Sequence, residues 1–152
     1  MQYIVDLFTN KLFLAPISAW LIAQIIKIII DSTKSGFRKE RLVAGCGMPS
    51  AHAATVSGLI IITGATFGTG SFELVVALVL GIIVICDARG VRYETQRQGR
   101  ALNNLNEERV EQGKQPLDIN KFKEKLGHTI PELIAGIIIG IICAIVVYHL
   151  PF

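Results

Sequence analysis

Long apolar runs constrain the fold of this chain more than any other feature of its sequence. Four such runs lie at about 12–30, 50–67, 72–91 and 129–149, separated by polar segments. A helix needs roughly 20 mostly apolar residues to cross a bilayer. Hydrophobic residues make up 51% of the chain and charged residues only 18%, which is more apolar than a usual soluble domain. The sequence therefore predicts an all-α protein, a four-helix transmembrane bundle in one membrane domain over residues 1–152.

Small residues four positions apart indicate which runs pack most closely. Ala54 and Gly58 have this spacing in the second run, and Gly136 and Gly140 have it in the fourth. Small residues at this spacing let the backbones of membrane helices approach each other. Because the second run is also rich in alanine, serine and glycine, we expect it inside the bundle.

Positive charge predicts which side of the membrane each polar segment faces. Segments 31–49 and 92–126 hold twelve of the fifteen Lys and Arg residues, and such segments stay in the cytoplasm. No small-residue cleavage site follows the first run, so we interpret it as an uncleaved helix. We expect a protein of the plasma (inner) membrane with both termini outside. Segment 92–126, divided by Gln115-Pro116, should form one or two short surface helices between the third and fourth spans.

The remaining composition excludes several classes of protein. Cys46, Cys86 and Cys143 are widely spaced and form no CxxC or other metal-ligand pattern, so neither a disulfide framework nor a zinc site is expected. The net charge is only +3, and basic residues do not alternate with aromatic ones as in nucleic-acid-binding proteins. We expect no metal, no cofactor and no nucleic acid. The expected partners are membrane lipids, and a homo-oligomer is left open.

The first candidate site is the short stretch 45–52, Gly-Cys-Gly-Met-Pro-Ser-Ala-His. Pro49 suits the first turn of a helix, and the glycines before it let the backbone bend. Ser50 and His52 would then lie in that first turn, where free N–H groups and the positive helix end attract anions. The alternative is a capping serine beside a histidine that has no chemical role.

The second candidate site is the stretch 127–132, Gly-His-Thr-Ile-Pro-Glu. His128 and Glu132 are four residues apart, so they share a helix face. A carboxylate held against one imidazole nitrogen fixes the tautomer and leaves the other nitrogen free, as a histidine nucleophile requires. The alternative is that Glu132 only caps the helix and that His128 is an interfacial residue.

The expected topology brings the candidate groups to the cytoplasmic face. Five ionisable residues should lie there, near the ends of the four spans: Lys27, His52, Arg89, Arg92 and His128. Ionisable groups inside spans cost about 2.5–3.5 kcal/mol each on insertion scales, so they usually have a function. Lys27 could bind phosphate or only extend to the interface. Asp87 could form an ion pair with either arginine or take part in catalysis.

Three motifs together resemble the divergent branch of the type 2 phosphatidic acid phosphatase superfamily, which also contains vanadium haloperoxidases. The motifs occur in the expected order and cover most of the chain: Gly47–His52, Gly90–Arg92 and Gly127–Glu132. The resemblance implies a metal-independent phosphatase with a phosphohistidine intermediate. It implies that His128 is the nucleophile, that Glu132 orients it, and that His52 protonates the leaving group.

The chain departs from the family pattern at several positions. Ala51 replaces the glycine of Pro-Ser-Gly-His, and Glu132 replaces the aspartate of His-xxx-Asp. The early Lys-x6-Arg-Pro motif keeps its lysine, Lys27, but has no Arg-Pro. The Ser-Arg pair that precedes the nucleophile is also absent, and Arg89 or Arg92 could replace its arginine in space.

The predicted function is that of a lipid-phosphate phosphatase, an acid phosphatase-related hydrolase of phosphoric monoesters or anhydrides. The predicted catalytic residues are His128, His52 and Glu132, and the predicted phosphate-binding residues are Lys27, Ser50, Arg89 and Arg92. Prenyl (di)phosphates and phosphatidate-like lipids are the expected substrates, because the site opens at the headgroup level. The alternative is a non-catalytic membrane protein that binds anionic lipid headgroups or a protein partner. A small transporter subunit is disfavoured, because the charges cluster at one end of the spans.

Overall fold

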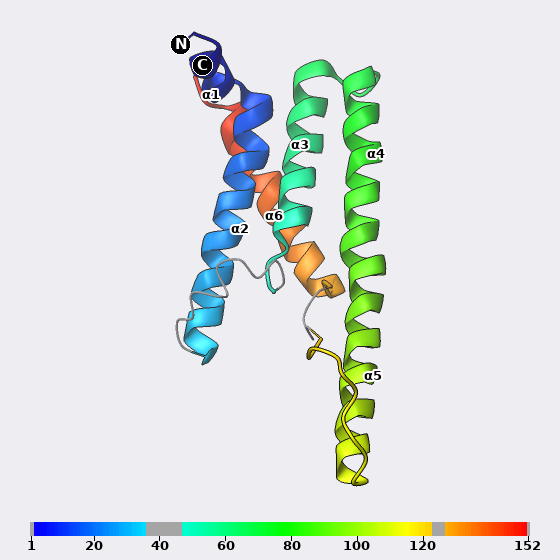
Figure 1. The fold of residues 1–152 in the computed structure, drawn as a ribbon. Helices are drawn as coiled ribbons and strands as arrows, with labels where there is room; N and C mark the ends of the chain where they lie inside the picture. Colours follow the sequence, from blue (N-terminus) through cyan, green and yellow to red (C-terminus); the bar gives the residue numbers. More distant parts are fainter. Residues whose placement is uncertain (1, 36–46, 123–126, 152) are drawn as a thin grey trace.

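The computed structural model describes residues 2–35, 47–122 and 127–151; most of these residues are helical, and none of them is in a strand. The elements are α1 (Gln2–Thr9), α2 (Lys11–Ser35), α3 (Ala51–Phe67), α4 (Phe72–Cys86), the π-helical turn η2 (Asp87–Val91), α5 (Arg92–Glu111) and α6 (Ile130–Tyr148). In Figure 1, α2, α3, α4 and α6 form a bundle, with both termini at one end. Helix α5 continues α4 beyond the other end. The all-α prediction is confirmed.

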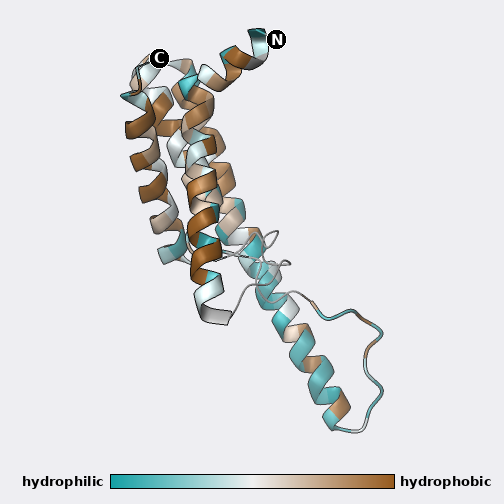
Figure 2. Ribbon diagram, turned by 90° about the vertical axis from the view of Figure 1, so that its left-hand side faces the viewer, coloured by the Kyte–Doolittle hydropathy of each residue, from teal (hydrophilic) through white to brown (hydrophobic). Residues whose placement is uncertain are grey.

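Several of these helices are able to span a membrane. Three are long and apolar enough by length and composition: Lys11–Thr33, the continuous helix Phe72–Glu111 and Ile130–Tyr148. Helix α3 is apolar but has 17 residues, at the lower end of the spanning range. The fourth crossing therefore stays a prediction. Figure 2 shows apolar residues along the bundle and hydrophilic ones along α5.

Helix α3 lies at the centre of the bundle, where it packs against α2, α4 and α6. Gly58 meets α2, since a Cβ at this position would lie 3.4 Å from the Ala15 carbonyl oxygen and from the Pro16 Cα. The small residues of the first half of this run are buried inside the bundle, as predicted: Ala51, Ala53, Ala54, Ser57 and Gly58.

The contact between α3 and α6 is closer still. Gly136 lies directly against the backbone oxygen of Ser50, and Gly140 lies against the side chain of Ser57, so that a Cβ at either glycine would collide. The Ser50 N–H also donates to the Glu132 carbonyl at 2.9 Å. The close approach predicted from the GxxxG spacing is confirmed, and it sets the first turns of the two helices side by side.

Some local predictions were wrong. Helix α3 begins at Ala51, with Ser50 as its N-cap, so Pro49 precedes the helix and is not in its first turn. The sequence did not predict that the helix of the third run continues beyond the span, as α4 does through η2 into α5. Among the described residues of segment 92–126 there is one helix, α5, which agrees with the expectation of one or two; residues 112–122 are not helical. The sequence also did not predict α1. Residues 36–46, including Gly45 and Cys46, lie outside the described residues.

The long helix formed by α4 and α5 allows a test of orientation. Thr69, in the turn before α4, and Glu107, in α5, lie near its opposite ends. The charge distribution predicts that Glu107 is in the cytoplasm. In a variant lacking the native cysteines, an impermeant maleimide should label Thr69→Cys in intact cells and Glu107→Cys only after lysis. The reverse pattern would place the candidate site on the outer face.

Candidate active site

Two histidines meet at the end of the bundle from which α5 extends. His52 is in the first turn of α3, and His128 precedes α6 by two residues. Their ring centroids are 5.7 Å apart and the ring planes cross at 77°. His128 is fully buried, with 0% of its surface exposed. The fold therefore brings together the histidines of both candidate stretches.

Ser50 fixes the start of α3, the helix that carries His52. The buried Ser50 hydroxyl accepts the Ala53 N–H at 3.3 Å, so this side chain caps the helix. Because the Ser50 N–H is bonded to the Glu132 carbonyl, the beginnings of α3 and α6 are linked through their backbones. The capping role matches the alternative that the sequence left open for Ser50, and phosphate binding by this residue stays a prediction.

The carboxylate of Glu132 is part of a capping box at the start of α6. It accepts the Thr129 N–H at 2.9 Å. Among the described residues, none hydrogen-bonds to Nδ1 or Nε2 of His128, or to Nδ1 of His52. Buried polar atoms normally have a partner, so these nitrogens are suited to a bound group. A hydrogen bond between Glu132 and the His128 ring, which the spacing had suggested, is not formed, and a catalytic role for Glu132 stays a prediction.

Two cations accompany the histidines. The Lys27 side chain is buried in α2, with 2% exposed, and its charge and that of Arg92 both act on His128. Arg92 Nε donates to Asp87 Oδ2 at 2.6 Å, which gives Asp87 the ion-pair role. Arg89 is exposed on the same turn. Arg92 is exposed as well, but it lines a cavity together with His52, and Arg89 does not. Phosphate binding by either arginine stays a prediction.

A cavity of about 500 Å³ opens beside His52 and Arg92. Its walls are mostly apolar. His52, Thr55 and Arg92 come from the beginnings of α3 and α5, and Gln24 comes from the middle of α2. The lining residues are Trp20, Gln24, Ala51, His52, Thr55, Val56, Leu80, Val84 and Arg92. The sequence did not single out Trp20, Gln24 or Thr55 as residues of the candidate site. A concave apolar space with a few polar groups is typical of a small-molecule site.

Comparison with known proteins agrees with the motifs that meet here. A model of the divergent PAP2 family matches residues 8–143. The chain belongs to the divergent PAP2 family. It is also similar to "Uncharacterized membrane protein YuiD" of Bacillus subtilis (strain 168), with 31% identity over 158 residues, 95% of this chain and 98% of that protein. No solved structure matches it. The resemblance seen in the sequence is confirmed, and the protein is an integral membrane protein.

Burial decides the charge of His128 in this divergent PAP2 protein. His128 lies just outside the membrane-spanning part of α6. Removal of its ring from water lowers the pKa of His128 to about 4; the Glu132 carboxylate opposes this shift, whereas Lys27 and Arg92 add to it. The imidazole is therefore neutral at pH 7, and a neutral ring has the free electron pair that a nucleophile needs.

The protonation of His128 can be followed directly. Its NMR signal, identified by its loss in His128→Gln, should titrate with a midpoint near pH 4 in the folded protein. Because the pKa in the unfolded chain is about 6.5, this group stabilises the fold above that pH, and its contribution is lost as the pH falls from 6.5 towards 4. A midpoint near 6.5 in the folded protein would show that His128 is not buried as described.

Proposed function

We propose that this protein is a metal-independent lipid-phosphate phosphatase that forms a phosphohistidine on His128. The observation that carries the proposal is the His52–His128 pair, with 5.7 Å between ring centroids, beside a cavity with apolar walls. Membership of the divergent PAP2 family supports phosphatase-related chemistry at the level of the superfamily. We place the site on the cytoplasmic side of the inner membrane, on the basis of the charge distribution.

Binding of the phosphate depends on positive charge. Lys27 and Arg92 supply two cations near the histidines, and the N-terminus of α3 adds the positive end of a helix dipole. Asp87 holds the Arg92 guanidinium in place through the 2.6 Å ion pair. Preorganised charges of this kind stabilise the charge that develops on phosphoryl oxygens in the transition state.

The chemistry takes place in two displacements at phosphorus. In the first, a ring nitrogen of His128 forms a bond to phosphorus, the phosphorus–oxygen bond to the lipid breaks, and the departing alkoxide takes a proton from His52. In the second, water attacks the phosphohistidine, the phosphorus–nitrogen bond breaks, and His52 accepts the proton of the water. His52 lines the cavity, and His128, whose ring centroid is 5.7 Å from that of His52, is not among the lining residues. The proposal therefore includes a turn of the His52 ring that admits the phosphate to His128.

The walls of the cavity favour a substrate with a hydrocarbon chain. Val56, Leu80 and Val84 surround the space, and His52 and Arg92 contribute its basic groups. A lipid could place its hydrocarbon chain against the three apolar side chains and its phosphate beside the two basic ones. Prenyl (di)phosphates and phosphatidate-like lipids both have this arrangement of chain and headgroup.

A second candidate function is the binding of anionic lipid headgroups without catalysis. The engagement of Glu132 in the capping box favours it, because the carboxylate does not then hold the imidazole of His128. The same cations and cavity would bind a headgroup phosphate without transferring it.

Phosphate release by purified protein separates the two functions. With phosphatidate, phosphatidylglycerophosphate and prenyl phosphates in the presence of chelator, wild type should release phosphate, and His128→Ala should release none. His52→Ala should be slower by about 10²–10⁴-fold, the usual value of general acid catalysis. His149→Ala, a histidine after the far end of α6, is the matched control and should resemble wild type.

One result of this assay would exclude the phosphatase. If wild type and His128→Ala release no phosphate from any of these lipids, while both bind vesicles that contain anionic lipid, the phosphatase is excluded and headgroup binding stands.

A further inference from the structure

The position of the His128 ring is not set by hydrogen bonds to its own nitrogens. No described residue bonds to Nδ1 or Nε2, and the Glu132 carboxylate is bonded to the Thr129 N–H. A nucleophile must nevertheless be held in line with phosphorus, since small displacements cost much of the rate. The restraint must therefore act on His128 through its backbone and its packing.

The π-helical turn η2 supplies one such restraint. In an α-helix the Arg92 N–H would bond to the carbonyl four residues earlier, that of Ala88. Here it bonds to the Asp87 carbonyl, five residues earlier, and the Ala88 carbonyl accepts the His128 N–H at 3.1 Å. Single π-turns within α-helices are frequent at functional sites. In this π-turn the Ala88 carbonyl is left to accept the backbone N–H of His128, the proposed nucleophile.

Gln96 supplies the second restraint, one turn further along. It is 8% exposed in a helix whose side chains are mostly exposed, and its Oε1 accepts the Gly127 N–H at 3.2 Å. Gly127 lies so close to α5 that a Cβ would come within 2.6 Å of the Tyr93 nitrogen. Two successive N–H groups, those of residues 127 and 128, are thus bonded to the same continuous helix.

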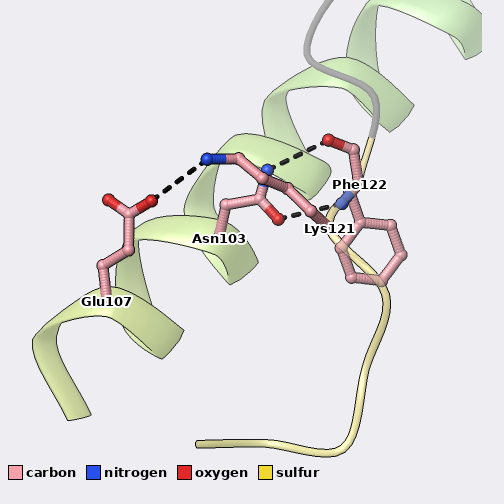
Figure 3. Close-up of polar contacts among 4 residues, drawn as sticks. All are labelled: Asn103, Glu107, Lys121 and Phe122. Carbon is pink, nitrogen blue, oxygen red and sulfur yellow. Dashed lines mark hydrogen bonds and ion pairs between the residues drawn. The ribbon is translucent and has the colours of Figure 1, made fainter. Parts of the chain in front are cut away.

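The same face of α5 also binds the segment that leads from α5 towards α6. The buried residues of α5 are Gln96, Gly99 and Asn103, a spacing that places them on one face. The Asn103 amide donates to the Phe122 carbonyl and accepts the Phe122 N–H, both at 3.0 Å, and Lys121 pairs with Glu107 beside it (Figure 3). The chain is therefore fastened to α5 at residue 122 and again at residue 127.

We propose that Gln96 is a positioning residue, which together with the Ala88 carbonyl of η2 holds His128 against the α4–α5 helix at the place where it attacks phosphorus. The kinetic part of this inference rests on the proposed phosphatase function. Arg92, which lines the cavity with His52, belongs to the same continuous helix. One rigid element therefore sets the position of the phosphate relative to the nucleophile.

The experiment uses the full-length purified protein and three substitutions. Gln96→Met keeps a side chain of similar length but removes the acceptor, and Gln96→Glu retains an oxygen that can accept the Gly127 N–H. Gln98→Met makes the same exchange at an exposed position of the same helix and is the matched control. Two quantities are measured: kcat and KM for phosphate release, and the rate at which diethyl pyrocarbonate modifies His128, located by mass spectrometry.

The expected result is specific to positioning. Gln96→Met should lower kcat on the order of 10²-fold, with KM nearly unchanged, and should make the buried His128 react severalfold faster with the reagent. Gln96→Glu and Gln98→Met should resemble wild type in both respects. Should Gln96→Met not yield folded protein, Gln96→Ser, whose hydroxyl is too short to reach Gly127, takes its place with the same expectation.

Two results would overturn the inference. One is a Gln96→Met protein whose His128 reacts at the wild-type rate, whatever its kcat. The other is a Gln96→Glu protein that is as impaired as Gln96→Met, since the acceptor would then not be the cause. If wild type itself releases no phosphate from any lipid, the proposed function fails, and the reactivity of His128 alone decides whether Gln96 positions it.

Discussion

The close packing of α6 on α3 is the contact on which the rest of this structure depends. Gly136 and Gly140 have no side chain to separate the helices, so their backbones meet Ser50 and Ser57 directly. Lipid supplies no hydrophobic force between helices, and close backbone contact is one of the few interactions that can hold them together. Because the two helices start side by side, the His52 ring lies against the ring of His128, which precedes α6.

The site itself is defined mainly by backbone groups. The Ser50 N–H joins α3 to α6 through the Glu132 carbonyl, and the His128 N–H joins the start of α6 to η2 through the Ala88 carbonyl. Near this frame His128 and Lys27 are buried, and the His52 ring lies 5.7 Å from that of His128. The buried ring nitrogens of His128 have no hydrogen-bond partner among the described residues. This is unfavourable unless something compensates, and under the proposed function a bound phosphate would supply the partner.

The sequence predicted the helices well and the local geometry of the site less well. Long apolar runs set the ends of α3 and α6 to within a residue or two, because helix length in a bilayer is limited by its thickness. The π-turn could not be foreseen, since a shift of one residue in hydrogen bonding leaves no mark in composition. Glu132 was ambiguous for a physical reason: a glutamate that follows His128 by four residues is also the third residue of the helix after the Thr129 cap, and the cap forms.

The central claim is that His128 becomes phosphorylated, and trapping the intermediate tests it most directly. Wild-type protein would be mixed with a lipid phosphate labelled in its phosphoryl group, quenched in alkali within the first turnover, and digested for mass spectrometry. The account predicts alkali-stable, acid-labile label on the peptide that contains His128, and none on that peptide in His128→Gln. Release of phosphate without such a label, or with label on another residue, would contradict it.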